Sequence, residues 1–266
     1  MGLLDAIGQL HVPIVATLPT VRIVSLVPSI TELLCDLGLA HCLVGRTGFC
    51  IHPSSVVKKI AKVGGTKDVN VEKIRQLAAT HLIVNIDENE KAIVDVLREF
   101  IPHVIVTHPL TAKDNLTLYR LLGRIFGVEK RAEELCAEFE TAYAQITPVQ
   151  TNKTMLYCIW KDPWMTISAD TYIANMLGLI GWKAWVESRS NLRSLQRYPV
   201  FEWDDVVLSQ IDCVLLSSEP YRFTEQHVIE LEQKIAKPVQ LVDGEMFSWY
   251  GSRAISGLLY LRQLNE

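Results

Sequence analysis

The stretch Val71–Asn85, VEKIRQLAATHLIVN, decides the fold because the chain contains a second version of it, WDDVVLSQIDCVLLS, at Trp203–Ser217. Each copy has an acid at its start, continues as a short helical pattern, and ends as an apolar strand that stops at a polar residue. The alignment needs no gap and places Glu72 on Asp204. The sequence therefore predicts an internal duplication of one helix–strand unit.

The repeat extends beyond these two stretches. FIPHVIVTHP at Phe100–Pro109 matches IAKPVQLVDG at Ile235–Gly244, and the second copy carries an insertion that contains residues 220–223, PYRF. A duplicated α/β unit predicts two similar lobes with a ligand cleft between them.

Strands and helices alternate along the first lobe. A β-branched run at Arg22–Val27 stops at Pro28, and Ser29–Glu32 has the pattern of a capping box ahead of an apolar helix. Further strands are predicted at residues 42–46, 82–85 and 104–107, with helical stretches at residues 71–78 and 89–100. This alternation predicts a parallel sheet with helices on its faces.

A longer helix separates the two copies of the repeat. Residues Glu129–Ile146 contain no Gly or Pro and carry apolar side chains at helical spacing, which predicts one continuous helix. We therefore expect an N-terminal α/β lobe at residues 20–110, connecting helices at 111–150 and a C-terminal α/β lobe at 151–266.

Composition and charge exclude several classes of protein. The formal net charge is −4 and the basic residues are scattered, which argues against nucleic-acid binding. No apolar run approaches the roughly 20 residues needed to span a bilayer, so we expect no membrane insertion. The first residues contain Asp5 and no Lys or Arg before their apolar portion, unlike a secretory signal. We therefore expect a cytoplasmic location, or a periplasmic one if the start is misassigned or trimmed.

Aromatic and polar side chains gather after the predicted strands of the second lobe. All six tryptophans lie in the second half of the chain, and the densest loop is Asp243–Arg253, DGEMFSWYGSR. A rigid aromatic surface with polar groups between its rings suits a flat, polar-edged small molecule, although core packing of the same rings remains an alternative. The candidate ligand-binding residues in these loops are Trp160, Trp164, Glu219, Tyr221, Glu245, Met246, Phe247, Trp249, Tyr250 and Arg253.

Signatures of catalysis and metal binding are absent from the sequence. There is no GxSxG, Walker, HExxH or GxGxxG motif, and Cys50 with His52 lacks a second pair at metal-site spacing. An enzyme in which Glu219, Asp243 or Glu245 acts as acid or base remains open. A buried carboxylate with a raised pKa beside a second polar group would favour that enzyme, and an open cleft walled by aromatic rings would favour binding.

The chain resembles the class III solute-binding proteins of ABC importers, in particular the cobalamin-binding members. The resemblance rests on RIVSLVPSITELLCDLG at Arg22–Gly38, on VGGTKDVNVEKI at Val63–Ile74, and on two repeated lobes around a central helix. It implies an α/β fold of two rigid lobes joined by one long backbone helix, with a metal chelate such as cobalamin, haem or a siderophore between them. It also implies no catalysis and no intrinsic cofactor.

The resemblance carries site residues as well. The family's cleft aromatics correspond to Phe49, Trp160 or Trp164, Tyr198, and Met246 with Phe247, while two of its tryptophan positions hold Thr66 and Asn85. The glutamates that dock on arginines of the permease correspond to Glu72 and Asp204.

We therefore expect a monomeric solute-binding protein that delivers a metal chelate, most simply cobalamin or another corrinoid, to an ABC importer. One alternative is a cytoplasmic carrier or sensor of such a ligand with the same fold. The other alternative is the enzyme in which Glu219, Asp243 or Glu245 acts as acid or base.

Overall fold

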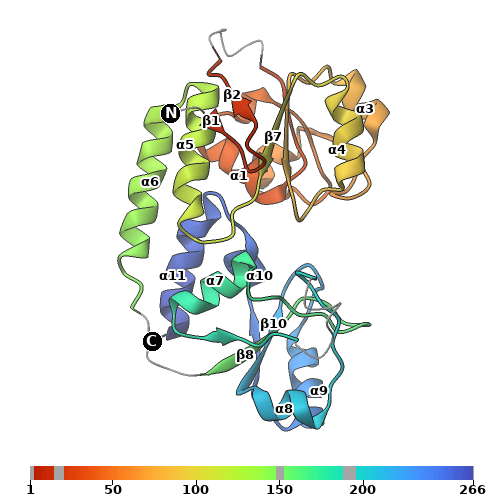
Figure 1. The fold of residues 1–266 in the computed structure, drawn as a ribbon, viewed down its shortest axis with the longest axis vertical. Coiled ribbons are helices and arrows are strands. Elements are labelled where there is room, and N and C mark those ends of the chain that lie inside the picture. Colours follow the sequence, from red (N-terminus) through yellow and green to blue (C-terminus); the bar gives the residue numbers. More distant parts are fainter. Residues whose placement is uncertain (1–2, 15–20, 148–152, 188–195, 266) are drawn as a thin grey trace. The chain divides into compact units, whose positions relative to one another are not determined.

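The structure, a computed structural model, describes residues 3–14, 21–147, 153–187 and 196–265. The chain forms two compact units (Figure 1). Unit 1 comprises Met1–Pro109, Lys113–Glu140 and Tyr250–Arg253, and unit 2 comprises Leu110–Ala112, Thr141–Trp249 and Ala254–Glu266. Each unit is thus built from three segments of the chain, whereas the sequence suggested one continuous range for each lobe.

Unit 1 is organised around a five-stranded parallel sheet with the order β5-β4-β3-β6-β7. The strands are β3 (Ile23–Ser25), β4 (Leu43–Arg46), β5 (Ala61–Lys62), β6 (His81–Asn85) and β7 (His103–Thr107). Every residue of β6 is buried, as expected for a parallel strand covered on both faces. A separate antiparallel pair, β1 (Leu3–Leu4) and β2 (Leu10–His11), precedes the sheet.

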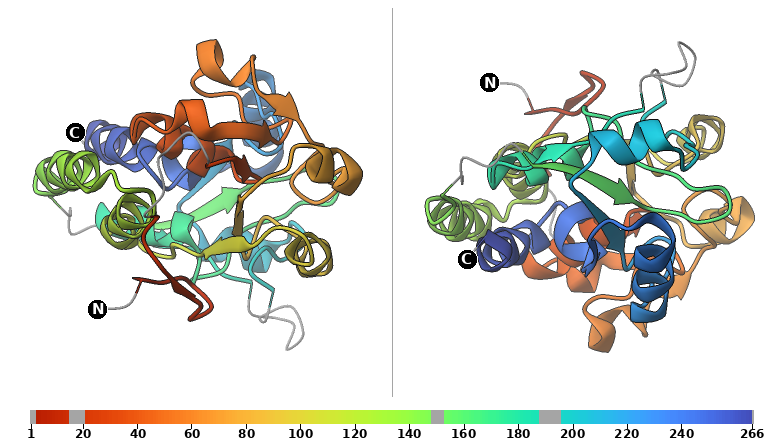
Figure 2. Two further views of the ribbon diagram at one scale, coloured as in Figure 1. Left: turned by 90° about the horizontal axis from the view of Figure 1, so that it is seen from above. Right: turned by 90° about the horizontal axis from the view of Figure 1, so that it is seen from below.

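Helices cover both faces of this sheet. The helices of this part of the chain are α1 (Pro28–Asp36), the 3-10 turn η2 (Ala40–Cys42), α2 (Ser54–Val57), α3 (Val71–Gln76), α4 (Lys91–Arg98), α5 (Asp114–Phe126) and α6 (Glu129–Tyr143). Ile74 of α3 and Leu97 of α4 pack with Val84 and Val104 of the sheet in one buried cluster. Helices α5 and α6 run beside each other (Figures 1 and 2), and a Cβ on Gly123 would lie only 2.5 Å from that of Ala132.

Unit 2 repeats this plan in a four-stranded parallel sheet with the order β11-β10-β8-β9. Its strands are β8 (Thr154–Cys158), β9 (Lys183–Ala184), β10 (Cys213–Ser217) and β11 (Val239–Val242). The repeated segments give β6 and β7 in unit 1 and β10 and β11 in unit 2, and in each sheet they follow β3 or β8 in the same order. The predicted α/β duplication is therefore confirmed.

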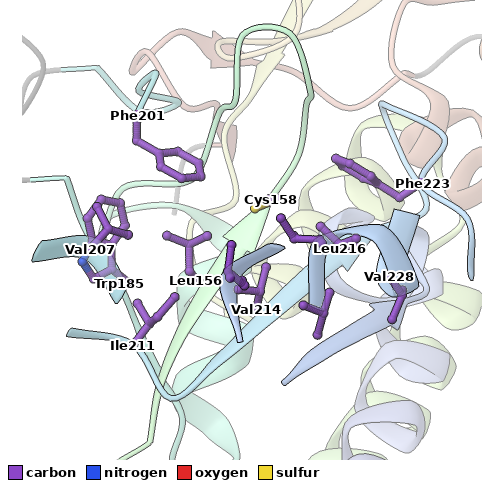
Figure 3. Packing of buried hydrophobic residues seen from close by; sticks show 13 residues of the cluster. Leu156, Cys158, Trp185, Phe201, Val207, Ile211, Val214, Leu216, Phe223 and Val228 are labelled. Atoms are coloured by element: carbon purple, nitrogen blue, oxygen red, sulfur yellow. The ribbon is translucent and has the colours of Figure 1, made fainter. Parts of the chain in front are cut away.

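The core of unit 2 lies on both sides of its sheet. Its helices are α7 (Tyr172–Leu179), α8 (Asp205–Gln210), α9 (Glu225–Ile235), α10 (Gly244–Ser248) and α11 (Arg253–Asn265). Helices α8 and α9 lie on one side of the sheet and α7 and α11 on the other (Figures 1 and 2). Leu156, Val214 and Leu216 face the first side, where they pack with Val207 and Val228 (Figure 3).

Two local expectations change in the structure. Helix α1 begins at Pro28 with Val27 as its N-cap residue, so Ser29–Glu32 lies inside the helix and forms no capping box. Proline favours this because its fixed φ suits the first helical turn and its missing N–H costs no hydrogen bond there. The helix predicted at Glu129–Ile146 ends three residues earlier, at Tyr143.

Candidate functional site

The carboxyl ends of the parallel strands in unit 2 carry an aromatic pair, an exposed Trp160 and a half-buried Tyr221. Trp160 follows β8 and Tyr221 follows β10, and their rings meet edge to face with centroids 5.5 Å apart. The Tyr221 backbone N–H donates to the carbonyl oxygen of Ile159 at 3.3 Å, which ties the two loops together. Trp160 is 38% exposed although tryptophan is mostly well buried, so its ring presents apolar surface at a strand end.

Trp164, the alternative to Trp160, lies deeper. Its ring stacks on Phe223 at 5.8 Å and meets Trp203 edge to face at 5.4 Å. Phe223 belongs to the buried cluster of unit 2 (Figure 3), and Trp164 packs against that cluster. Trp164 therefore supports the loop from beneath, while Trp160 offers the more accessible ring.

Glu219 precedes Tyr221 in the loop after β10, and its carboxylate is fixed by two donors. Ser248 Oγ donates to Glu219 Oε1 at 2.6 Å, and Trp249 Nε1 donates to the same oxygen at 2.7 Å. Burial raises the pKa of the Glu219 carboxyl, the two hydrogen bonds lower it, and nearby Glu245 and Asp243 raise it further. The sequence suggested Glu219 and Trp249 as separate candidates, and the structure shows that they are hydrogen-bonded to each other.

The loop after β11 holds the remaining candidates of unit 2. Asp243 caps α10 by accepting a hydrogen bond from the Glu245 N–H at 3.0 Å. Glu245 and Met246 are half-buried on that helix. Phe247 is fully buried, with its ring 5.5 Å from Tyr157 and 5.9 Å from Tyr260, and so it is a core residue of unit 2.

The end of the same loop belongs to unit 1. Tyr250 Oη donates to Glu88 Oε1 at 2.5 Å, and Arg253 forms a two-bonded ion pair with Glu32, with Nε donating to Oε2 at 2.7 Å. The predicted cluster Asp243–Arg253 is thus divided, since Trp249 is grouped with unit 2 and Tyr250 with unit 1.

Unit 1 also presents large apolar side chains at the carboxyl ends of its strands. Phe49 after β4 is 62% exposed, Ile51 in the same loop is 49% exposed, and Ile86 directly after β6 is 46% exposed. The two isoleucines were missed by the sequence analysis. Their signal is an apolar residue in a polar loop just past a predicted strand.

The two positions that hold Thr66 and Asn85 form a polar scaffold under this edge. Asn85 is buried, and its Oδ1 accepts a hydrogen bond from the Asp87 N–H at 2.8 Å. The Asn89 side-chain amide donates to the carbonyl oxygen of Thr66 at 2.9 Å. Asp87 lies 3.3 Å from His108 Nε2, in a partly buried pair that sequence reasoning also missed.

Tyr198 lies half-buried in unit 2, directly after Arg197. The Arg197 guanidinium pairs with Asp170 at 2.8 Å. The ligand contact predicted for Tyr198 stays a prediction.

Both predicted docking carboxylates are exposed, but they occupy different helical positions. Glu72 is the second residue of α3, whose N-cap is Asn70. Asp204 is itself the N-cap of α8 and accepts a hydrogen bond from the Val207 N–H at 2.8 Å.

Cys50 is the buried member of the Cys50 and His52 pair. Its sulfur contacts the hydroxyls of Thr31 at 3.1 Å and Thr47 at 3.2 Å, and burial raises the pKa of its thiol. Among the residues that the structure describes, no group of three His, Cys, Asp or Glu side chains is arranged to hold a metal ion. Within the same residues, no helix has the length and apolarity that a membrane span requires.

Comparison with known proteins identifies a family and a relative that this chain matches. The profile of a family described as "Periplasmic binding protein" matches residues 23–235. An uncharacterized ABC transporter substrate-binding lipoprotein, YvrC of Bacillus subtilis (strain 168), is 28% identical over 170 residues, which cover 60% of this chain and 53% of that protein. The chain therefore matches about half the length of that curated relative.

Solved structures show the same fold. The periplasmic vitamin B12 binding protein BtuF of Vibrio cholerae superposes with a TM-score of 0.74 at 17% identity, covering 91% of this chain and 95% of that one. The periplasmic heme-binding protein RhuT from Roseiflexus sp. RS-1 gives a TM-score of 0.74 at 17% identity, covering 92% and 99%. At these identities the likeness concerns the fold alone.

The expectation of a cytoplasmic location is wrong. The matched family is one of periplasmic binding proteins, and the matched relative is a lipoprotein of an ABC transporter. The sequence argument failed because it rested on the first residues of the chain.

Proposed function

Because the chain belongs to the periplasmic binding protein family, we propose that it is the substrate-binding protein of an ABC importer and that its ligand is a metal chelate, most simply a corrinoid such as cobalamin. The curated relative carries the name of an ABC transporter substrate-binding lipoprotein. Two proteins of the same fold are named for binding vitamin B12 and heme, both of which are flat metal chelates.

One observation carries the proposed ligand class. In each unit, large apolar side chains stand exposed where the parallel strands end, namely Phe49, Ile51 and Ile86 in unit 1 and Trp160 in unit 2. Ligands of open α/β sheets bind outside the carboxyl ends of the strands. Exposed rings at that edge supply the stacking surface that a planar macrocycle requires.

A catalytic role for the nearby acids has weaker support. Glu219 meets part of the expectation for an enzyme, because its pKa is raised by burial and it touches two polar groups. However, Asp243 is engaged in capping α10. The two donors to Glu219 are the side chains of Ser248 and Trp249, which hold the carboxylate as part of the fold. The family consists of solute-binding proteins, so we favour binding over catalysis.

Calorimetric titration with cyanocobalamin and with haemin tests the proposal. We expect at least one of the two to bind, and Trp160→Ala and Phe49→Ala each to weaken it by about 1 to 3 kcal/mol, taking stacking of bases on aromatic rings as the guide. Ile229→Ala is the matched control, because Ile229 is an exposed apolar residue within α9 and not in a loop that follows a strand. If neither chelate binds, or if Ile229→Ala weakens binding as much as Trp160→Ala does, the proposed ligand class is wrong.

A partner contact follows from the same proposal. Glu72 and Asp204 are exposed acids near helix starts, one in each unit, and we propose that they contact basic residues of the permease. Glu72→Gln together with Asp204→Asn should lower import without changing ligand affinity. Unchanged import in the double variant would rule the two acids out as docking residues.

A further inference from the structure

Glu219 offers one carboxylate oxygen that the protein leaves open. Both of its side-chain hydrogen bonds, from Ser248 Oγ and Trp249 Nε1, go to Oε1. Among the described residues, Oε2 receives no hydrogen bond, and it is not one of the buried polar atoms that lack a partner. Oε2 therefore reaches solvent at the carboxyl end of β10, in the loop that also carries Tyr221.

The backbone around Glu219 fixes the direction of this oxygen. Ser217 Oγ donates to the Glu219 carbonyl oxygen at 2.5 Å, and the Gly244 N–H donates to Ser218 Oγ at 2.9 Å. Gly244 packs so closely that a Cβ there would lie 2.6 Å from Glu219 Cγ and 2.9 Å from its backbone nitrogen. A carboxylate held at its backbone, at its Cγ and at Oε1 has little freedom to turn away, so a ligand would meet Oε2 in one orientation.

The electrostatic surroundings of Glu219 favour a donor and oppose a second anion. Its carboxyl is partly desolvated, and Glu245 and Asp243 add negative potential. A hydrogen-bond donor that approached Oε2 would compensate for the lost water, whereas a carboxylate of the ligand would add a like charge at short range.

We propose that Glu219 determines ligand specificity, with Oε2 accepting a hydrogen bond from the rim of the ligand, so that the site selects chelates fringed with N–H donors over chelates fringed with carboxylates. This inference rests on the proposed function as a chelate receptor. It narrows the substrate class to macrocycles with carboxamide or amine side chains.

Two corrinoids that share a ring test it directly. Dicyanocobinamide carries carboxamides on its rim, and dicyanocobyrinic acid carries carboxylates at the same positions. Calorimetry at pH 7 should show that the wild-type protein prefers the carboxamide form by about tenfold or more, as expected for one hydrogen bond to a charged acceptor. Glu219→Gln should reduce that preference by about tenfold, because the variant loses the charge while its amide oxygen can still accept from Ser248 and Trp249.

Two further variants separate the role of Glu219 from general effects. Glu225→Gln removes an exposed acid of the same unit in the first turn of α9, and it should leave the preference unchanged. Ser248→Ala keeps the charge but removes one of the two donors to Oε1, and it should lower the preference by a smaller factor than Glu219→Gln. Circular dichroism and the unfolding midpoint check that each variant is folded.

The outcomes distinguish this inference from the proposed function. If wild type and folded Glu219→Gln both bind and prefer the carboxamide corrinoid to the same extent, the role of Glu219 is overturned and chelate binding stands. An equal loss of preference in Glu225→Gln also overturns it, since net charge alone would then explain the effect. Failure of both corrinoids and of haemin to bind the wild-type protein overturns the proposed function and this inference together.

Discussion

Acidification from pH 7 to pH 5 should destabilise unit 1 through one histidine, His81. Its ring is buried at the start of β6, where it stacks on His103 at 4.7 Å and meets the edge of Phe126 at 5.2 Å. Burial, followed by the proximity of His103 and then of His11, lowers the pKa of His81 from 6.5 to about 4. The fold therefore holds His81 neutral in a pH range where the unfolded chain protonates it.

The sign and size of the effect follow from proton linkage. Between pH 6.5 and pH 4 the unfolded chain binds more protons at this position, so the free energy of unfolding is lost as the pH falls. Across the whole range from pH 6.5 to pH 4, His81 changes the free energy of unfolding by about 3 kcal/mol. About 2 kcal/mol of stability is lost between pH 7 and pH 5. Two of these histidines have a further polar contact. Thr80 Oγ1 lies 2.8 Å from His81 Nδ1, and His11 pairs with Asp5 at 3.2 Å.

Urea unfolding of wild type and of His81→Phe at the two pH values measures this contribution. Phenylalanine keeps a ring in the stack, and Thr80 Oγ1 retains its hydrogen bonds with the backbone of Arg22. On acidification from pH 7 to pH 5, we expect the free energy of unfolding to fall by about 2 kcal/mol more in wild type than in the variant. Phe126→Leu is the control, since it weakens the same packing without removing a titrating group and should lower stability similarly at both pH values. A difference between wild type and His81→Phe below about 0.5 kcal/mol would refute the reasoning.

Three further substitutions probe the strand-end loops and the helix start of unit 2. Phe247→Ala should cost about 3 to 5 kcal/mol of stability in chemical denaturation because its ring is fully buried, and a loss of ligand affinity without that cost would instead place the ring in the site. Gly244→Ala should lower the thermal midpoint, with a cost of about 1 to 3 kcal/mol, because the added Cβ collides with Glu219; an unchanged midpoint would show that the loop yields freely. Asp204→Ala should cost about 1 kcal/mol by removing the hydrogen bond to Val207, whereas Asp204→Asn should keep it, so equal losses in the two variants would contradict the capping role.

The sheets could be predicted from the sequence because parallel strands buried on both faces appear as short apolar runs. The predicted strands at 82–85 and 104–107 differ from β6 and β7 by one residue at their starts. The repeat added that the same helix–strand unit occurs twice, and the structure contains it as β6 with β7 and as β10 with β11.

The burial of individual rings could not be predicted in the same way. Trp160 and Phe247 both follow predicted strands, yet Trp160 is exposed and Phe247 is fully buried between Tyr157 and Tyr260. The difference is set by tertiary packing, because α10 turns Phe247 towards the sheet of unit 2 and the loop after β8 turns Trp160 away from it. Composition predicts an aromatic loop but not which of its rings meets a ligand.

The division of the Asp243–Arg253 loop had no local signal either. Arg253 pairs with Glu32, and the Gly251 N–H donates to Asn115 Oδ1 at 2.6 Å, so the partners lie far away in the sequence. Gly251 has a φ of 80°, which disfavours any residue with a side chain, and a Cβ there would lie 3.1 Å from the Ser29 carbonyl oxygen. Glycine marks the turn in the sequence, but only the structure shows which unit receives the residues after it.

The two predicted docking acids show how a correct alignment can still mislead about geometry. Aligning the strands pairs Glu72 with Asp204, whereas aligning the helix starts pairs Asn70 with Asp204, because both of those side chains accept an N-cap hydrogen bond. The connection from α8 to β10 is shorter than that from α3 to β6, which shifts the second helix along the sequence relative to its strand. Glu72 is exposed on α3 and pairs at 3.7 Å with Arg75 of the same helix, while the Asp204 carboxylate is already bound to the N–H of Val207. A basic residue of a partner would have to share that carboxylate with the helix, so the contacts made by the two units should differ in strength.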